Sequence, residues 1–148
     1  MEFVRIDKNN KQYLKSIVKE FRHQDIDDEK ALSFINHPSI VCYACIVDEI
    51  AIGYTYAYRL PRMDNGNDIM QIYHLFVKAT HRRKGIARKL ITLLLDYAKQ
   101  EKLHYVLLLT GNDDSFKAAR NLYESLGGYN HPDFKETYYW YITGRPQP

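Results

Sequence analysis

An apolar strand and an apolar helix follow each other near the middle of the chain, joined by a basic turn with one glycine. Residues 69–77 are rich in β-branched and aromatic residues and contain neither Pro nor Gly, which is typical of a buried strand. After the turn at residues 81–85, apolar side chains recur at helical spacing: Ile86, Leu90, Leu93, Leu94 and Tyr97. Because one stripe of this helix must pack on the sheet, the fold is expected in the α/β or α+β class.

The turn itself has the features of a phosphate-binding segment. The first N–H groups of a helix have no partner inside it and lie at the positive end of its dipole. Gly85 and the small Ala87 would let a phosphate approach this backbone. Positive charge comes from Arg82, Arg83 and Lys84. The alternative is an ordinary basic helix start, and the patterns of Walker-type and dinucleotide-binding loops are not matched.

The same stretch resembles the acyl-CoA site of GNAT superfamily N-acetyltransferases. Their signature, Gln/Arg-x-x-Gly-x-Gly/Ala after a strand, is matched by residues 82–87. Asn112 follows the next expected strand, and residues 122–127 are similar to the family's Leu-Tyr-x-x-x-Gly segment. Together these features extend over the second half of the chain. Within the superfamily the chain looks closest to aminoglycoside 3-N-acetyltransferases and diamine acetyltransferases.

The resemblance implies a fold and a cosubstrate. The implied fold is a single domain over residues 1–148, with a mixed, mostly antiparallel sheet of about six to seven strands flanked by about four helices. The implied cosubstrate is acetyl-CoA, with its pantetheine arm along a strand end and its pyrophosphate at the glycine turn. The binding residues implied on this chain are Leu75, Phe76, Val77, Arg82, Arg83, Lys84, Gly85, Ile86, Ala87, Arg88, Asn112 and Ala119.

Acetyl transfer to an amine also requires proton transfers. An alkyl ammonium of pKa near 10.4 must lose a proton, at a cost of roughly 4 to 5 kcal/mol at neutral pH, which a base working near pH 7 reduces. His74 is either that base, directly or through a water, or a hydrogen-bonded histidine of a buried sheet. Asp68 and Glu49 are weaker candidates. The resemblance implies that Tyr123 protonates the departing thiolate, the alternative being a core tyrosine.

Charges and tyrosines bear on the acceptor amine. Acidic residues at 25, 27–29 and 113–114 either cap helices on the surface or attract a cationic acceptor, such as an aminoglycoside or a polyamine. Tyr54, Tyr56 and Tyr58 share one face of a strand and either line an acceptor groove or pack on a helix. A protein N-terminal or lysine acetyltransferase and a non-catalytic acyl-CoA sensor are the alternative functions.

Other features of the sequence argue against nucleic-acid, membrane and metal partners. A net charge of +3 from 21 basic and 18 acidic residues does not indicate a nucleic-acid binder. The amino terminus lacks an apolar run suited to a signal peptide or membrane span, so a cytoplasmic protein without a membrane partner is expected. Cys42 and Cys45 should point to opposite faces of a strand, which disfavours a disulfide, and no metal site is expected. The tyrosine-rich final strand either pairs across a homodimer or lies in the core.

The remaining elements follow from periodicity and breakers. The first strand covers residues 3–6, and the first helix is capped by Asp7 or Asn9. A second helix begins at about Asp28 and ends before His37-Pro38. A later helix, 116–126, is capped by Asp114 or Ser115. The other expected strands are 41–47 and 50–60, joined by a turn at 48–49, then 104–110 and 137–143.

Overall fold

A seven-stranded sheet forms the centre of the protein, in the order β1-β2-β3-β4-β5-β7-β6. The computed structural model describes residues 1–111, 113–130 and 137–142. All neighbouring strands pair antiparallel except β4 and β5, which run parallel. The strands are β1 (Glu2–Arg5), β2 (Ile40–Val47), β3 (Ile50–Leu60), β4 (Ile69–Val77), β5 (Val106–Leu109), β6 (Tyr129–Asn130) and β7 (Thr137–Trp140). This architecture confirms the expected mixed, mostly antiparallel sheet.

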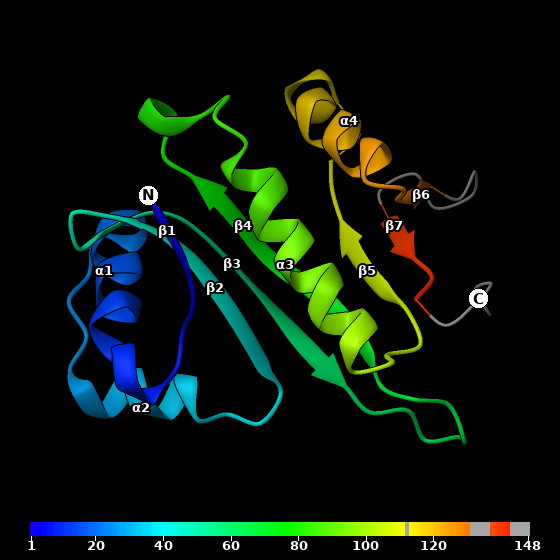
Figure 1. The fold of residues 1–148 in the computed structure, drawn as a ribbon, viewed down its shortest axis with the longest axis horizontal. Coiled ribbons are helices and arrows are strands. Elements are labelled where there is room, and N and C mark those ends of the chain that lie inside the picture. The colour runs from blue at the N-terminus through cyan, green and yellow to red at the C-terminus, as the bar shows by residue number, and fades with distance from the viewer. Residues whose placement is uncertain (112, 131–136, 143–148) are drawn as a thin grey trace.

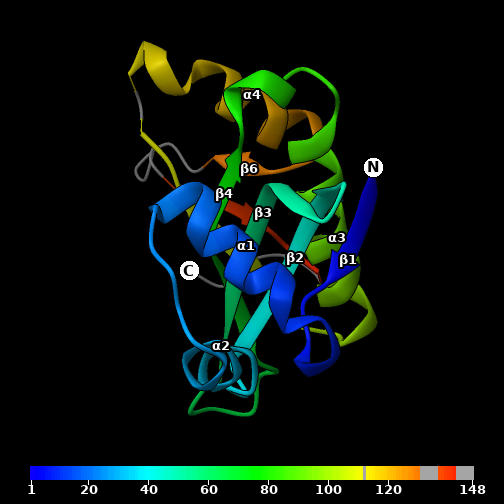
Figure 2. The same ribbon diagram turned by 90° about the vertical axis from the view of Figure 1, so that its left-hand side faces the viewer.

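Four α-helices of the described chain cover the two faces of the sheet (Figures 1 and 2). They are α1 (Lys11–Arg22), α2 (Asp28–Ile35), α3 (Ile86–Gln100) and α4 (Lys117–Ser125). Side chains of α1 and α2 form one core cluster with Cys42, Ala44 and Tyr54. Side chains at the start of α3 pack on the opposite face against Cys45 and Ile52. The two cysteines thus face opposite sides, buried and unpaired, as their spacing predicted.

The helix starts differ in detail from the sequence prediction. Asp7 caps a 3-10 turn at Lys8–Asn10, and α1 begins directly after that turn, so Asn9 is not the cap. Asp27 caps α2 by accepting a hydrogen bond from the Lys30 N–H at 2.8 Å. The prediction of Asp114 or Ser115 before α4 was wrong. Asp113 fills this role, because its side chain accepts from the Ser115 N–H across a further 3-10 turn.

The strands differ mainly at the carboxyl-terminal edge. The short strand β6 was not predicted, because two residues are too few to show a period. Strands β5 and β7 are shorter than expected, and Thr143, the predicted end of the last strand, lies outside the described residues. The predicted turn at Asp48 and Glu49 is confirmed, and both residues have positive φ, 49° and 68°. Two such residues in a two-residue hairpin define a type I′ turn.

Candidate active site

Strands β4 and β5 separate before β4 ends. They pair at only three described positions, ending at Ile72 and Leu108, whereas β4 continues to Val77 (Figure 1). The β3–β4 register also slips here: His74 lies opposite Tyr56 and Ile72 opposite Ala57, so Tyr73 forms a bulge. Bulges redirect side chains and are common beside active sites. The β5-facing edge of residues 73–77 therefore has no partner strand in the described chain and can pair with an extended ligand.

The start of α3 presents free backbone N–H groups beside this edge. Gly85 precedes the helix with φ 78° and ψ 10°, and no side chain caps the first turn, which contains no acidic residue. A Cβ on Gly85 would meet no atom within 4 Å, so it is the left-handed backbone, and not crowding, that favours glycine. At Gly53 the reason is crowding, since a Cβ there would lie 3.0 Å from the Ile86 side chain. This close approach holds the start of α3 against β3.

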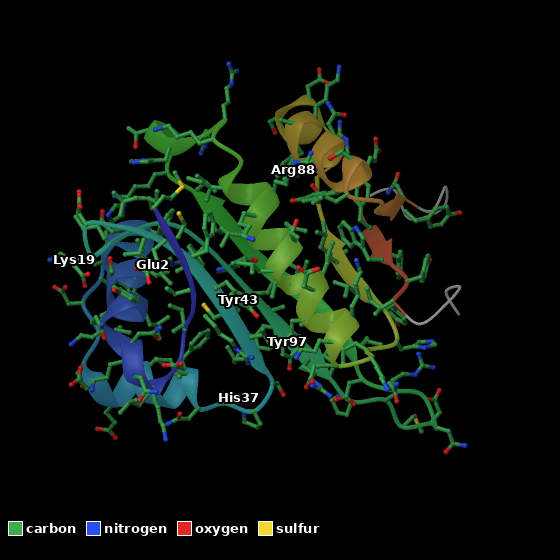
Figure 3. All side chains as sticks on the ribbon, in the orientation of Figure 1. Glu2, Lys19, His37, Tyr43, Arg88 and Tyr97 are labelled. Atoms are coloured by element: carbon green, nitrogen blue, oxygen red, sulfur yellow. The ribbon has the colours of Figure 1, made fainter. Side chains whose placement is uncertain are left out.

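The residues of the basic turn differ in which of their groups remain free to contact a ligand. The Ile86 side chain is only 2% exposed and belongs to the core, so only its backbone can contact a ligand. Arg82 donates to the Val77 carbonyl at 3.3 Å, and Arg88 donates to the Ser125 hydroxyl at 2.7 Å, linking α3 to α4 (Figure 3). Arg83 and Lys84 are exposed and make no ion pair with a described residue. These two cations are the most available for an anion.

His74 lies on the opposite face of the sheet, toward α1 and α2. Its Nδ1 is 3.1 Å from the Tyr54 hydroxyl, and its backbone carbonyl accepts from the Thr55 hydroxyl at 2.7 Å. Burial, and secondarily the positive charge of Arg22, lower the pKa of His74 below its ordinary value of about 6.5. Burial raises the pKa of Tyr54 to about 12, so its hydroxyl stays protonated. A neutral imidazole held by a tyrosine is the result.

A cavity of about 520 Å³ opens in front of His74, within the range of roughly 300 to 1,000 Å³ typical of small-molecule sites. Aromatic rings form much of its wall, with Tyr54 and Tyr56 stacked at 6.4 Å and Phe34 edge-on to Tyr56 at 5.2 Å. Tyr54 and Tyr56 thus line a cavity and also pack on helices, which joins the two sequence alternatives, whereas Tyr58 contacts Tyr56 and Tyr73 and is not a lining residue. The remaining lining residues are Leu14, Ile17, Val18, Arg22, Gln24, Ile26, Lys30, Cys42 and Tyr73.

The other base candidates lie away from His74. Asp68 forms an ion pair with Arg59 at 2.8 Å near the opposite end of β4. Glu49 sits in the β2–β3 hairpin, where it accepts from the Tyr13 hydroxyl at 3.4 Å. Neither of them lines the cavity. His74 is therefore the sequence candidate that the structure places at this site.

Tyr123 is buried on the other face of the sheet. Its ring contacts Tyr138 and Trp140, at centroid distances of 5.4 and 6.0 Å, and burial raises its pKa. Leu75 and Ala119 pack against the same core cluster as Tyr123. Among the described residues, the ring of Tyr123 contacts residues of β7 and does not contact His74. Its link to β4 is the core cluster that it shares with Leu75. Asn112 lies outside the described residues.

Sequence comparison identifies the family to which this site belongs. Residues 7–128 match the family described as Acetyltransferase (GNAT) family. This match covers most of the chain, which therefore belongs to the GNAT acetyltransferase family. Acetyl-CoA is the cosubstrate of this family. In the described residues, no helix is long and apolar enough to cross a membrane.

Individual relatives agree with this assignment. Human N-acetyltransferase 8 is 40% identical over 58 residues, which are 39% of this chain and 25% of the relative. Rat N-acetyltransferase family 8 member 2 is 27% identical over 92 residues, 62% of this chain and 37% of the relative. The matched part of the chain thus spans between a quarter and two fifths of the length of these relatives.

Solved structures share the fold at low identity. An aminoglycoside acetyltransferase from an uncultured soil metagenomic sample superposes with a TM-score of 0.72 at 18% identity, covering 85% of this chain and 90% of that one. Arabidopsis thaliana NAA60 in complex with acetyl-CoA superposes with a TM-score of 0.70 at 20% identity, covering 97% and 99%. These similarities establish the GNAT fold.

Proposed function

We propose that the protein is an N-acetyltransferase that transfers the acetyl group of acetyl-CoA to a primary amine by direct attack within a ternary complex. One observation carries the proposal. The unpaired edge of β4 adjoins the uncapped start of α3, and the same strand presents His74 to a cavity on the other face. A thioester along that edge would lie between a phosphate site and a base.

The residues present fit acetyl-CoA. Leu75, Phe76 and Val77 supply the unpaired backbone edge to which an extended pantetheine arm can hydrogen-bond. Residues 85–88 supply the free N–H groups and the positive dipole end that favour a pyrophosphate, with Arg83 and Lys84 adding charge. Acetyl-CoA supplies the activated acetyl carbon, and the chain holds and orients it.

His74 would remove the proton from the acceptor amine. For this role the imidazole Nε2 must carry a free lone pair. The ring proton is then on Nδ1, which donates a hydrogen bond to the Tyr54 hydroxyl oxygen, 3.1 Å away. The amine nitrogen then bonds to the thioester carbon and the carbon–sulfur bond breaks. As the amide forms, the second proton leaves the nitrogen for solvent, and the sulfur gains one proton, for which Tyr123 is the proposed donor. Tyr123 then recovers a proton from solvent and His74 releases the first one, so that one proton is released in each cycle.

Direct attack by the amine also agrees with the protonated state of the one cysteine among the described residues that line the cavity, Cys42. Cys42 lines the cavity, and an acetylated cysteine would be the alternative route. Burial raises the pKa of Cys42 to about 12, so the thiolate that would be needed is not formed at neutral pH. This supports the amine itself as the nucleophile of the proposed reaction.

The comparisons support an acetyltransferase but do not determine its acceptor, so a small-molecule acceptor is part of the proposal. The solved neighbours include aminoglycoside acetyltransferases and a ribosomal-protein-alanine N-acetyltransferase from Brucella melitensis. The sequence predicts a small cationic acceptor, drawn by acidic residues. In the structure Asp27 caps α2 and Asp28 pairs with Lys15, and no carboxylate is among the described residues that line the cavity. The proposed acceptor is therefore a small-molecule amine.

Calorimetric titration with acetyl-CoA tests the proposal. Gly85→Glu places bulk and negative charge at the expected pyrophosphate position and should abolish binding. Gly127→Glu is a matched control, because Gly127 also has a positive φ, 87°, and open space around its Cβ position, but lies after α4. Micromolar binding lost only in Gly85→Glu supports the proposal. Absence of binding in the wild type, or equal losses in both variants, would contradict it.

A further inference from the structure

The cavity in front of His74 has a distinctive charge. Two cations line it, Arg22 at the end of α1 and Lys30 in the first turn of α2, and no described lining residue is acidic. Neither cation forms an ion pair with a described residue, although other cations of this face do, Lys15 with Asp28 and Lys78 with Glu20. Both side chains belong to exposed residues at the rim. The entrance thus presents positive charge to an incoming acceptor.

Helix stability does not explain both positions. A cation at the end of a helix is favoured by the helix dipole, which accounts for Arg22. Lys30 stands in the first turn of α2, where the same dipole disfavours a positive charge. Helix stability therefore gives no reason for this charge, and no described ion pair occupies it, so Lys30 is available to an anionic group at the cavity.

Aromatic side chains form one side of the cavity. Phe34, Tyr56 and Tyr73 lie in a connected set of ring contacts, and Tyr73 stacks on His74 at 4.6 Å. Such a wall binds an apolar or aromatic body, and its ring faces attract an ammonium group before the proton is lost. The two cations, the aromatic rings and the histidine thus line one cavity, and the charge of Arg22 acts on His74 directly.

We propose that the acceptor is a small amine that carries a carboxylate and an apolar body, in the manner of an α-amino acid or a conjugate of one. The carboxylate lies against Arg22 and Lys30, the apolar body against the rings of Tyr56 and Phe34, and the amine beside His74. The inference rests on the proposed function and narrows its substrate; the bonds formed and broken are unchanged.

A pair of probes that differ only in the carboxylate tests the inference. Phenylalanine and phenethylamine share the amine and the aromatic body, so the ratio of their kcat/KM values isolates the carboxylate. A charge-assisted contact predicts a ratio of about ten or more in favour of phenylalanine. Arg22→Gln and Lys30→Gln should each bring the ratio toward one. Lys19→Gln, which removes a cation of α1 outside this cavity, should leave it unchanged (Figure 3).

The competing acceptors are measured in the same assay. Faster acetylation of spermidine, sisomicin or a peptide N-terminus than of phenylalanine would overturn the inference, as would a ratio that Arg22→Gln and Lys30→Gln leave intact. Acetyl-CoA binding without turnover of any carboxylate-bearing amine would also overturn it. The calorimetric titration separates the two levels, because loss of the proposed function appears there as absent acetyl-CoA binding, before any acceptor is added.

Discussion

The side chain of His74 connects the acceptor cavity to the strand that should hold the thioester. If it removes the amine proton, His74→Ala should lower kcat by roughly 100-fold or more, since general-base catalysis contributes about 10² to 10⁴. Affinity for acetyl-CoA should stay unchanged, because the phosphate site lies on α3. His37→Asn is the control, as the His37 ring accepts a hydrogen bond from the Ser39 N–H after α2 and is not among the residues that line the cavity. Full activity of His74→Ala would remove the residue from the mechanism.

The pH dependence of His74 follows from its surroundings. Tyr54 and Tyr56 face it from β3, Tyr73 adjoins it on β4, and Arg22 faces it from α1. Burial and the charge of Arg22 lower its pKa. As the pH decreases, kcat/KM should therefore stay high until the pH is below about 6.5. An NMR titration of the free protein should show the imidazole pKa rising toward its ordinary value in Arg22→Gln. A pKa that is unchanged in the variant would contradict this assignment.

The same shift has a consequence for stability. Because the pKa of His74 is lower in the folded state, the unfolded chain binds more protons between the folded pKa and about 6.5. The contribution of this residue to the free energy of unfolding therefore rises with pH through that window and is fully present above it.

Tyr123 offers a separate test on the other face of the sheet. Removing its hydroxyl in Tyr123→Phe keeps the ring contacts with Tyr138 and Trp140 but deletes the proposed proton donor. Turnover should fall about tenfold or more while acetyl-CoA affinity is retained. Tyr139→Phe, a tyrosine whose ring contacts Tyr105 and Tyr141, is the control. Equal turnover in both variants would leave Tyr123 with a packing role alone.

At the scale of single residues, the sequence revealed those that belong to local patterns. Gly85 stands in a recognisable turn, and Tyr54 and Tyr56 follow a period of two. Arg22 and Lys30 carry no such pattern, because they come from two helices that only the folded chain brings to one rim. Gly53 was missed for the same reason, since its meaning depends on contact with Ile86, 33 positions later.

At the scale of elements, long amphipathic segments were predictable and short irregular ones were not. The strands at residues 50–60 and 69–77 appear with the expected limits, because their apolar periods are long. The bulge at Tyr73 has no local signal, because it depends on the register with β3. Yet this bulge and the early end of the β4–β5 pairing shape the candidate site. The features closest to function were thus set by pairing between distant segments.

The β2–β3 hairpin supplies a prediction at this scale. Type I′ turns favour Asn-Gly, and here Asp48 and Glu49 both hold a positive φ. The double change Asp48→Asn with Glu49→Gly should raise the free energy of unfolding by about 1 kcal/mol by relieving this strain. Urea unfolding measures the effect. Glu29→Gly, the same change in the helical backbone of α2, should instead lower stability by about 0.5 to 1 kcal/mol.

At the scale of the whole molecule, the two proposed binding regions lie on opposite faces of the sheet. The proposed acceptor cavity is lined mainly by residues from the first half of the chain, and the proposed phosphate site is the start of α3. Strand β4 belongs to both, since its edge and His74 serve opposite faces. In the proposed mechanism the two ligands would therefore approach from different sides and meet at one strand, which is the geometry that direct transfer requires.

Ligand binding to this assembly should stabilise the entire fold. A ligand that binds only the folded state at a hundred times its Kd adds about 2.7 kcal/mol to the free energy of unfolding. For a chain of 148 residues this corresponds to a rise in Tm of roughly 5 to 10 °C. Thermal unfolding with acetyl-CoA should show this rise in the wild type and in Gly127→Glu but not in Gly85→Glu. An equal rise in Gly85→Glu would mean that the coenzyme binds elsewhere, because the altered helix start could not hold its pyrophosphate.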